Sequence, residues 1–203
     1  MRKILVGAAL AVLALPTLAQ GPKTVSYSIL KEGDPIGKEV YEIGQDGDLT
    51  SVKLTVESKV HILFLDFRYH HNRSEVWNGD KLVKLVADTD DDGTKHHVEA
   101  VDGKVTSDGK PMAVPDDSYP LVMWRKGVIG HSTLFAVESD DKPYHVAFKD
   151  VGAETLTIAG AKLDCEHYAM TGDVDRDLWY DADGMLAKVS FRRRGFGISI
   201  VRD

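Results

Sequence analysis

The chain has 203 residues, with 25 lysines and arginines against 32 aspartates and glutamates, and a net charge of −7 at pH 7. This acidic balance repels nucleic acid and anionic surfaces at long range, so we expect no nucleic-acid partner. Cys165 is the single cysteine, which excludes a disulfide within the chain, and we expect it to be a small buried hydrophobic residue.

The first segment, residues 1–19, has the features of a secretory signal peptide. Arg2 and Lys3 precede an apolar run that Pro16 interrupts, and small residues lead to Ala19. The run is too short to span a membrane, and no stop-transfer pattern follows it. We therefore expect cleavage after Ala19, export without a transmembrane anchor, and one β domain over residues 20–203.

From residue 24 onward, apolar and polar residues alternate between turn residues, which predicts strand after strand. The first two strands are expected at 24–30 and 38–43. The stretch 49–77 is too long for one strand, so we expect a bend or turn near Ser58-Lys59. Asn78-Gly79 predicts a type I′ hairpin into a strand at 81–88.

The next segment, "DTDDDGTKHHVE", matches a calcium-loop pattern through Asp88, Asp90, Asp92 and Glu99. A helical calcium site needs helices on both sides of the loop, whereas both flanks here are strand-like. Aspartate and glycine are also the residues that a tight turn requires. The sequence favours a hairpin turn and no metal site, with weak calcium binding as the alternative.

Two histidine pairs, His70-His71 and His96-His97, offer at most one ligand to each face of a strand. We therefore favour polar residues on a wet sheet face over a zinc site, which needs a third ligand. The basic stretch 191–196, "FRRRGF", is interpreted as a charged strand that protects a sheet edge from aggregation. The alternative is a site for nucleic acid or lipid head groups, against which alternation argues because it divides the arginines between two faces.

Residues 118–137 break the alternation, and a short helix is expected after Pro120, near 120–130. A long antiparallel sheet must bury one face, and this segment is the natural element for it to wrap. The predicted fold is all-β and mainly antiparallel, a curved meander or half-open β-barrel around one short helical segment. If it encloses an apolar cavity, we expect these residues at its wall: Leu121, Trp124, Leu134 and Phe135.

Four stretches resemble a family of uncharacterised exported proteobacterial proteins that contain a domain of unknown function. They are "YSILKEGDPIG", "EVWNGDKLVKLVADTDDDG", "LDCEHYAMTGDVDRDLWYDADGMLAKVSF" and "RRRGFGISIVRD", and the resemblance covers essentially the whole mature chain. The layout is also similar, more distantly, to half-barrel periplasmic carriers of lipoproteins and lipids. The resemblance implies a periplasmic location and supplies no catalytic residues.

Three functions remain open. The first is a non-enzymatic periplasmic carrier of an apolar or amphipathic ligand such as a lipid, and the second is an envelope interaction module with a filled core. The third is a hydrolase or metal-dependent enzyme, although no nucleophile motif is present and we expect no catalytic residue and no cofactor. The oligomeric state is left open.

Overall fold

The computed structural model describes residues 21–62, 65–138 and 142–203. The expected signal peptide lies outside these residues. Strands occupy most of the described chain: β1 (Lys23–Lys31), β2 (Asp34–Asp46), β3 (Leu49–Ile62), β4 (Leu65–Asn78), β5 (Lys81–Asp91), β6 (Thr94–Val101), β7 (Lys104–Ser107), β8 (Lys110–Pro111), β9 (Tyr119–Pro120), β10 (Thr133–Phe135), β11 (Pro143–Ile158), β12 (Ala161–Gly172), β13 (Arg176–Tyr180), β14 (Leu186–Arg193) and β15 (Phe196–Arg202).

These strands form one 15-stranded sheet in the order β8-β7-β6-β5-β4-β3-β2-β1-β15-β14-β13-β12-β11-β10-β9. Every neighbouring pair is antiparallel except β9 and β10. Strand β1 pairs with β15, with Ile29 opposite Ile200, so the first and last strands lie at the centre of the sheet. The two edges, β8 and β9, do not pair, and the sheet is a half-open barrel. The predicted fold class is confirmed.

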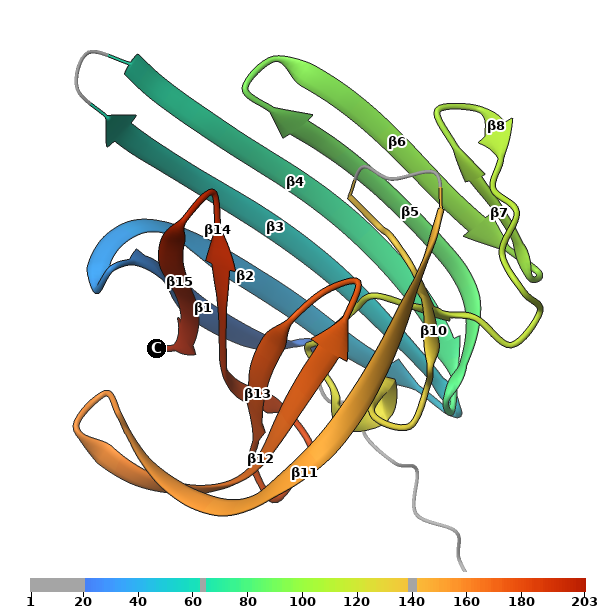
Figure 1. Cartoon of the computed structure of the whole chain (residues 1–203). Coiled ribbons are helices and arrows are strands. Elements are labelled where there is room, and N and C mark those ends of the chain that lie inside the picture. The colour runs from blue at the N-terminus through green and yellow to red at the C-terminus, as the bar shows by residue number, and fades with distance from the viewer. Residues whose placement is uncertain (1–20, 63–64, 139–141) are drawn as a thin grey trace, which may run out of the picture.

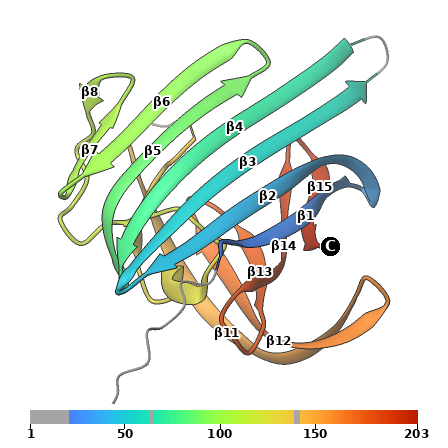
Figure 2. The ribbon, with the colours of Figure 1, turned by 180° about the vertical axis from the view of Figure 1, so that it is seen from behind.

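Figures 1 and 2 show how the sheet curves: the long strands β3 to β6 face the group β11 to β14 across the interior. The segment after β9 lies at one end, which we call the floor. Its only described helical turn is the 3-10 helix η1 (Lys126–Val128). Gly130, with φ of +100°, follows this turn, so the expected helix near 120–130 is reduced to a single turn.

Two details of the predicted hairpins were wrong. There is no turn near Ser58-Lys59, because β3 continues to Ile62 and pairs with β4 along its whole length. The turn between β4 and β5 is not type I′ with Asn78-Gly79 at its centre: Asn78 pairs with Lys81, the central residues are Gly79 and Asp80, and of these Gly79 alone has positive φ. The register of β4 against β5 shifts next to this turn, at Val76 and Trp77.

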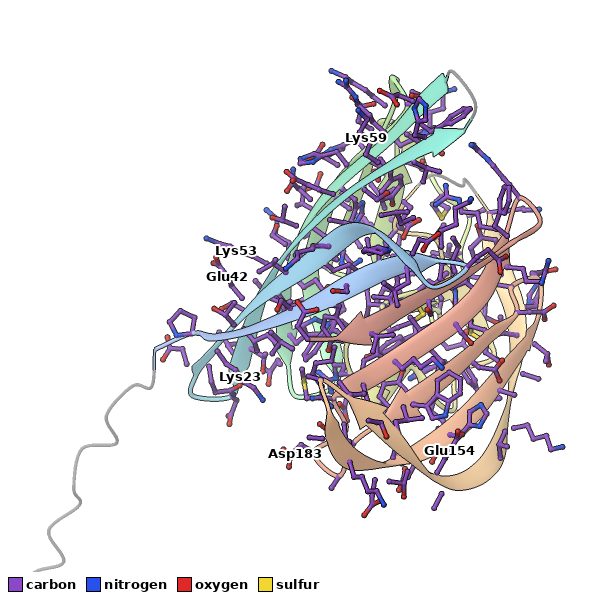
Figure 3. All side chains as sticks on the ribbon, turned by 90° about the vertical axis from the view of Figure 1, so that its left-hand side faces the viewer. Lys23, Glu42, Lys53, Lys59, Glu154 and Asp183 are labelled. Atoms are coloured by element: carbon purple, nitrogen blue, oxygen red, sulfur yellow. The ribbon has the colours of Figure 1, made fainter. Side chains whose placement is uncertain are left out.

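Successive side chains of a strand point to opposite faces of the sheet, so every second side chain points into the barrel. On the outer face of β2 and β3, Glu42 and Lys53 are register partners and project away from the interior (Figure 3). The inner row of β4 runs through Tyr69, His71 and Arg73 to Glu75 and Trp77, and is unusually polar for a barrel interior. A sheet face normally buries such groups only when they have partners.

The packed core fills the floor end of the barrel. Trp77, Tyr27 and Leu134 are fully buried there, and the Tyr27 hydroxyl donates to the Leu186 carbonyl oxygen at 2.8 Å. A smaller apolar cluster contains Cys165 and Trp179, so the prediction of a buried cysteine is confirmed.

Candidate functional site

Beyond the floor, the interior is hollow. A cavity of about 800 Å³ lies between the wall formed by β1 to β4 and the wall formed by β12 to β15. Its volume is in the range of sites for small organic ligands. Much of its lining is apolar, including Ile29, Val56, Met123, Met170, Phe191, Ile198 and Ile200.

A buried carboxylate, Glu75, separates the cavity from the floor. One of its oxygens accepts a hydrogen bond from Arg73 Nε at 2.6 Å. The other accepts from Trp77 Nε1 at 2.6 Å and from Trp124 Nε1 at 3.0 Å. Three donors and one opposite charge compensate the burial of this carboxylate, which would otherwise cost several kcal/mol.

Three neighbouring buried groups have shifted pKa values, two of them because of burial and one because of its charged and polar neighbours. Burial raises the pKa of Glu39 to about 7, against an opposing effect of Arg73. Burial and then Arg73 lower the pKa of His71 to about 4, so this histidine is neutral at physiological pH. Burial acts to lower the pKa of Arg73, but Glu75 and Tyr41 outweigh it, and the pKa rises above its ordinary value.

Glu138, just after β10, reaches into the cavity between the two walls. Its side chain is accessible to solvent through the cavity. Burial acts to raise its pKa, but His71, Arg176 and then Arg193 outweigh that effect and hold the pKa below its ordinary value. The cations that act on Glu138 at neutral pH come from both walls, since Arg73 lies on β4 and Arg176 on β13.

Arg176 is the deep cation of the opposite wall. Its guanidinium lies over the Phe191 ring, 4.3 Å from the centroid, and its Nε is buried with no hydrogen-bond partner. Burial lowers the pKa of Arg176, and Glu138 opposes this effect. Arginine remains charged in proteins, so a positive charge with an unused donor faces the apolar cavity.

At the exposed end of the cavity, two sequence motifs meet that are about a hundred residues apart. Arg193, from the stretch "FRRRGF", donates through Nη2 to Asp91 at 3.1 Å, and Arg194 lies 3.8 Å from the same carboxylate. Arg193 also lies over the ring of Tyr69. The prediction that "FRRRGF" protects a sheet edge was wrong, because β14 and β15 are central strands and this stretch forms their connecting turn.

The residues expected at a cavity wall lie elsewhere. Trp124, Leu134 and Phe135 are buried in the packed floor, and Leu121 packs against it. None of the four lines the cavity, where Met123 is the contribution of the same segment. The apolar segment plugs the barrel end instead of facing open space.

The acidic stretch forms the β5–β6 hairpin, as expected. Asp92 and Gly93 have positive φ at its turn, and Asp90 accepts a hydrogen bond from the Gly93 backbone N–H at 2.7 Å. Asp88 faces His97, and Glu99 lies inside β6 opposite Val86. In the described part of the chain, no group of three or more histidine, cysteine or acidic side chains has a geometry that would hold a metal ion.

The histidine pairs divide between the two faces of the sheet. His70 is exposed beside Glu57, and His97 is paired with Asp88 on the surface. His71 is the exception to the predicted wet face, because it is 1% exposed and bonded to Thr89 Oγ1 at 2.8 Å. Its position in the period-two row with Arg73 and Glu75 was the available signal that this face of β4 is interior.

The fold and cavity define a class: a half-open, antiparallel β-barrel with an internal cavity that combines apolar walls with buried charges. A family model described as a domain of unknown function, DUF6134, matches residues 27–203, and the chain belongs to that family. The predicted membership in an uncharacterised family is thus confirmed.

One solved structure has the same fold. It is described as a beta-barrel-like protein of the domain of unknown function DUF1849 from Brucella abortus, with a TM-score of 0.57 and 13% identity. The alignment covers 92% of this chain and 98% of that one, so the whole barrel is shared. No curated protein matches the sequence. Among the described residues, no helix has the length and apolarity needed to cross a membrane.

Proposed function

We propose that this protein is an exported, periplasmic carrier that binds the apolar part of an amphipathic ligand, such as a lipid, inside its barrel. The observation that carries the proposal is the cavity of about 800 Å³ with its apolar lining. Apolar surface exposed to water is unfavourable by roughly 25 cal/mol per Å², so an acyl chain that covers this lining gains free energy for binding.

The position of the cavity also supports a carrier over a module with a filled core. At the floor of the same barrel, large side chains such as Trp77 and Leu134 are completely buried, so part of the interior is filled by the chain's own residues. At the other end it keeps small or short side chains, such as Val56 and Ser58, facing the cavity. The unfilled end of the barrel therefore leaves room for a bound ligand.

The direct test is native mass spectrometry of the protein purified from cells without detergent. We expect an adduct with the mass of a lipid. The variant Ile198→Trp, which fills the cavity from β15, should lose it. The matched control is Val151→Trp, where the side chain is 52% exposed, and this variant should keep the adduct. A protein free of any adduct, and unable to take up lipid afterwards, would favour the filled-core module instead.

A second candidate function, catalysis on a substrate in the cavity, is favoured by one observation. The pKa of Glu39, raised by burial to about 7, suits a general acid or base. Ser58, Thr171 and Ser190 line the same cavity, but no hydrogen bond among the described residues joins any of them to a histidine or a carboxylate that would activate it. Turnover of p-nitrophenyl dodecanoate that disappears in Glu39→Gln would support this candidate, and no turnover by the wild-type protein would remove it.

A further inference from the structure

The charges in the cavity are distributed unequally along its length. Outside the lining, the buried Glu75 balances Arg73 through a hydrogen bond of 2.6 Å. On the lining itself, Glu138 acts on Arg176 and Arg193, and Asp91 pairs with Arg193 and Arg194. Burial holds Glu39 largely in its neutral form below about pH 7, so it adds little negative charge.

The other acidic side chains on the lining are engaged elsewhere. Asp173 accepts a hydrogen bond from the His145 backbone N–H at 2.8 Å, and Asp175 accepts one from the Gly172 N–H at 3.2 Å. Asp177 bonds His167 Nε2 at 2.9 Å, beside Trp179. Arg176 and Arg193 therefore have Glu138 and Asp91 as acidic partners, next to an apolar wall.

The two arginines are also held in a way that leaves donors available. Aromatic rings support both guanidinium groups: Phe191 packs against Arg176 at 4.3 Å and Tyr69 against Arg193 at 5.4 Å. A guanidinium that packs over a ring still has N–H groups at its own edge, where they suit a carboxylate or phosphate. Glu138, a carboxylate of the chain itself, lines the same cavity and interacts electrostatically with both arginines.

From this arrangement we propose that the ligand carries an anionic head, a carboxylate or a phosphate, which binds between Arg176 and Arg193 and displaces Glu138. The proposal rests on the function proposed above and specifies its ligand class. The acyl chain then lies along the apolar lining that includes Ile200 and Val56. Glu138 acts as an internal competitor of the ligand head.

The test measures the dissociation constants of delipidated protein for three probes with the same chain: dodecanoate, dodecyl phosphate and dodecanol. We expect both anions to bind more tightly than the alcohol. In Arg176→Met, binding of the anions should weaken by about ten- to a hundred-fold, while that of dodecanol changes little. Whichever anion binds more tightly identifies the head group as carboxylate or phosphate.

Two further variants keep the result interpretable. Glu138→Gln should strengthen binding of the anions by about ten-fold and leave dodecanol unchanged, an effect in the opposite direction that unfolding cannot produce. Lys188→Met, which removes a cation over Trp179 outside the cavity, should change nothing. Equal affinity for all three probes, insensitive to both cavity variants, overturns the anionic head and keeps the carrier. No binding of any probe overturns both.

Discussion

The floor and the cavity belong to the same barrel, but the floor is filled with packed side chains whereas the cavity is left open. At the floor, the segment 120–137 brings Trp124 and Leu134 onto Trp77, and Glu75 satisfies both indole N–H groups. In the cavity, strands of the same sheet leave about 800 Å³ open. Ionisable groups with shifted pKa values, Glu39 and His71, are buried in this region. Stability is therefore concentrated at the floor, and the features suited to binding lie in the cavity.

The largest expected loss of stability follows substitution of Glu75, which lies at the boundary between the floor and the cavity. Glu75→Ala leaves Arg73 buried without a counter-charge and removes the acceptor of two indole N–H groups. We expect a loss of about 3–5 kcal/mol in the free energy of unfolding, measured by urea denaturation. The control is Glu42→Ala on the outer face, for which about 0.5 kcal/mol or less is expected. Similar values for the two variants would contradict the importance of this boundary.

Truncation of an apolar side chain compares the two regions directly. Leu134→Ala at the floor should cost about 2–5 kcal/mol, because it opens a new void in a packed core. Ile198→Ala on the cavity wall should cost about 1–2 kcal/mol, since its side chain already borders open space. Equal costs in urea unfolding would show that the cavity is as well packed as the floor.

The pH dependence of stability separates two buried groups of the cavity region. Between pH 4.5 and about 7, folded Glu39 keeps a proton that the unfolded chain releases, so its contribution falls by about 3 kcal/mol as pH rises. For His71, with a folded pKa of about 4 against 6.5 unfolded, stability rises with pH over that interval. The two effects oppose each other in the wild-type protein.

Substitution of Glu39 or His71 alone separates their two contributions to the pH dependence of stability. Relative to the wild-type protein, Glu39→Gln should become more stable as pH rises from about 5 to 7, because only the histidine contribution remains. His71→Gln should become less stable over the same interval. Urea unfolding at both pH values measures the difference, and parallel pH profiles for the three proteins would refute the assignment.

The smallest effect is expected at the exposed end of the cavity. Asp91→Asn removes the partner of Arg193 and Arg194, whose side chains are 43% and 65% exposed, so we expect a loss of about 1 kcal/mol or less. Salt at about 1 M should remove the difference from the wild-type protein, because it screens exposed charges. A larger loss, insensitive to salt, would show that this contact is part of the stable floor network.

The sequence predicted the fold class well because period-two alternation and turn residues are local signals. The cavity was harder to predict, since it depends on which strands face each other across the barrel. Leu121 and Phe135 were expected at its wall for their apolarity, yet apolar residues are those that pack tightly. Arg176, Glu138 and Arg193 come from separate segments, and only the curvature of the sheet brings them together.

The pairing of β1 with β15 also has a consequence for how the chain folds. Residues 27–31 find their partners at 198–202, so a central ladder of the sheet closes a loop of nearly the whole described chain. Contacts so distant in sequence give a high contact order, and folding slows as contact order rises. Until β15 pairs with them, β1 and β14 each have an edge without backbone hydrogen-bond partners. We therefore expect a slow folding phase that begins only after the last strand is available.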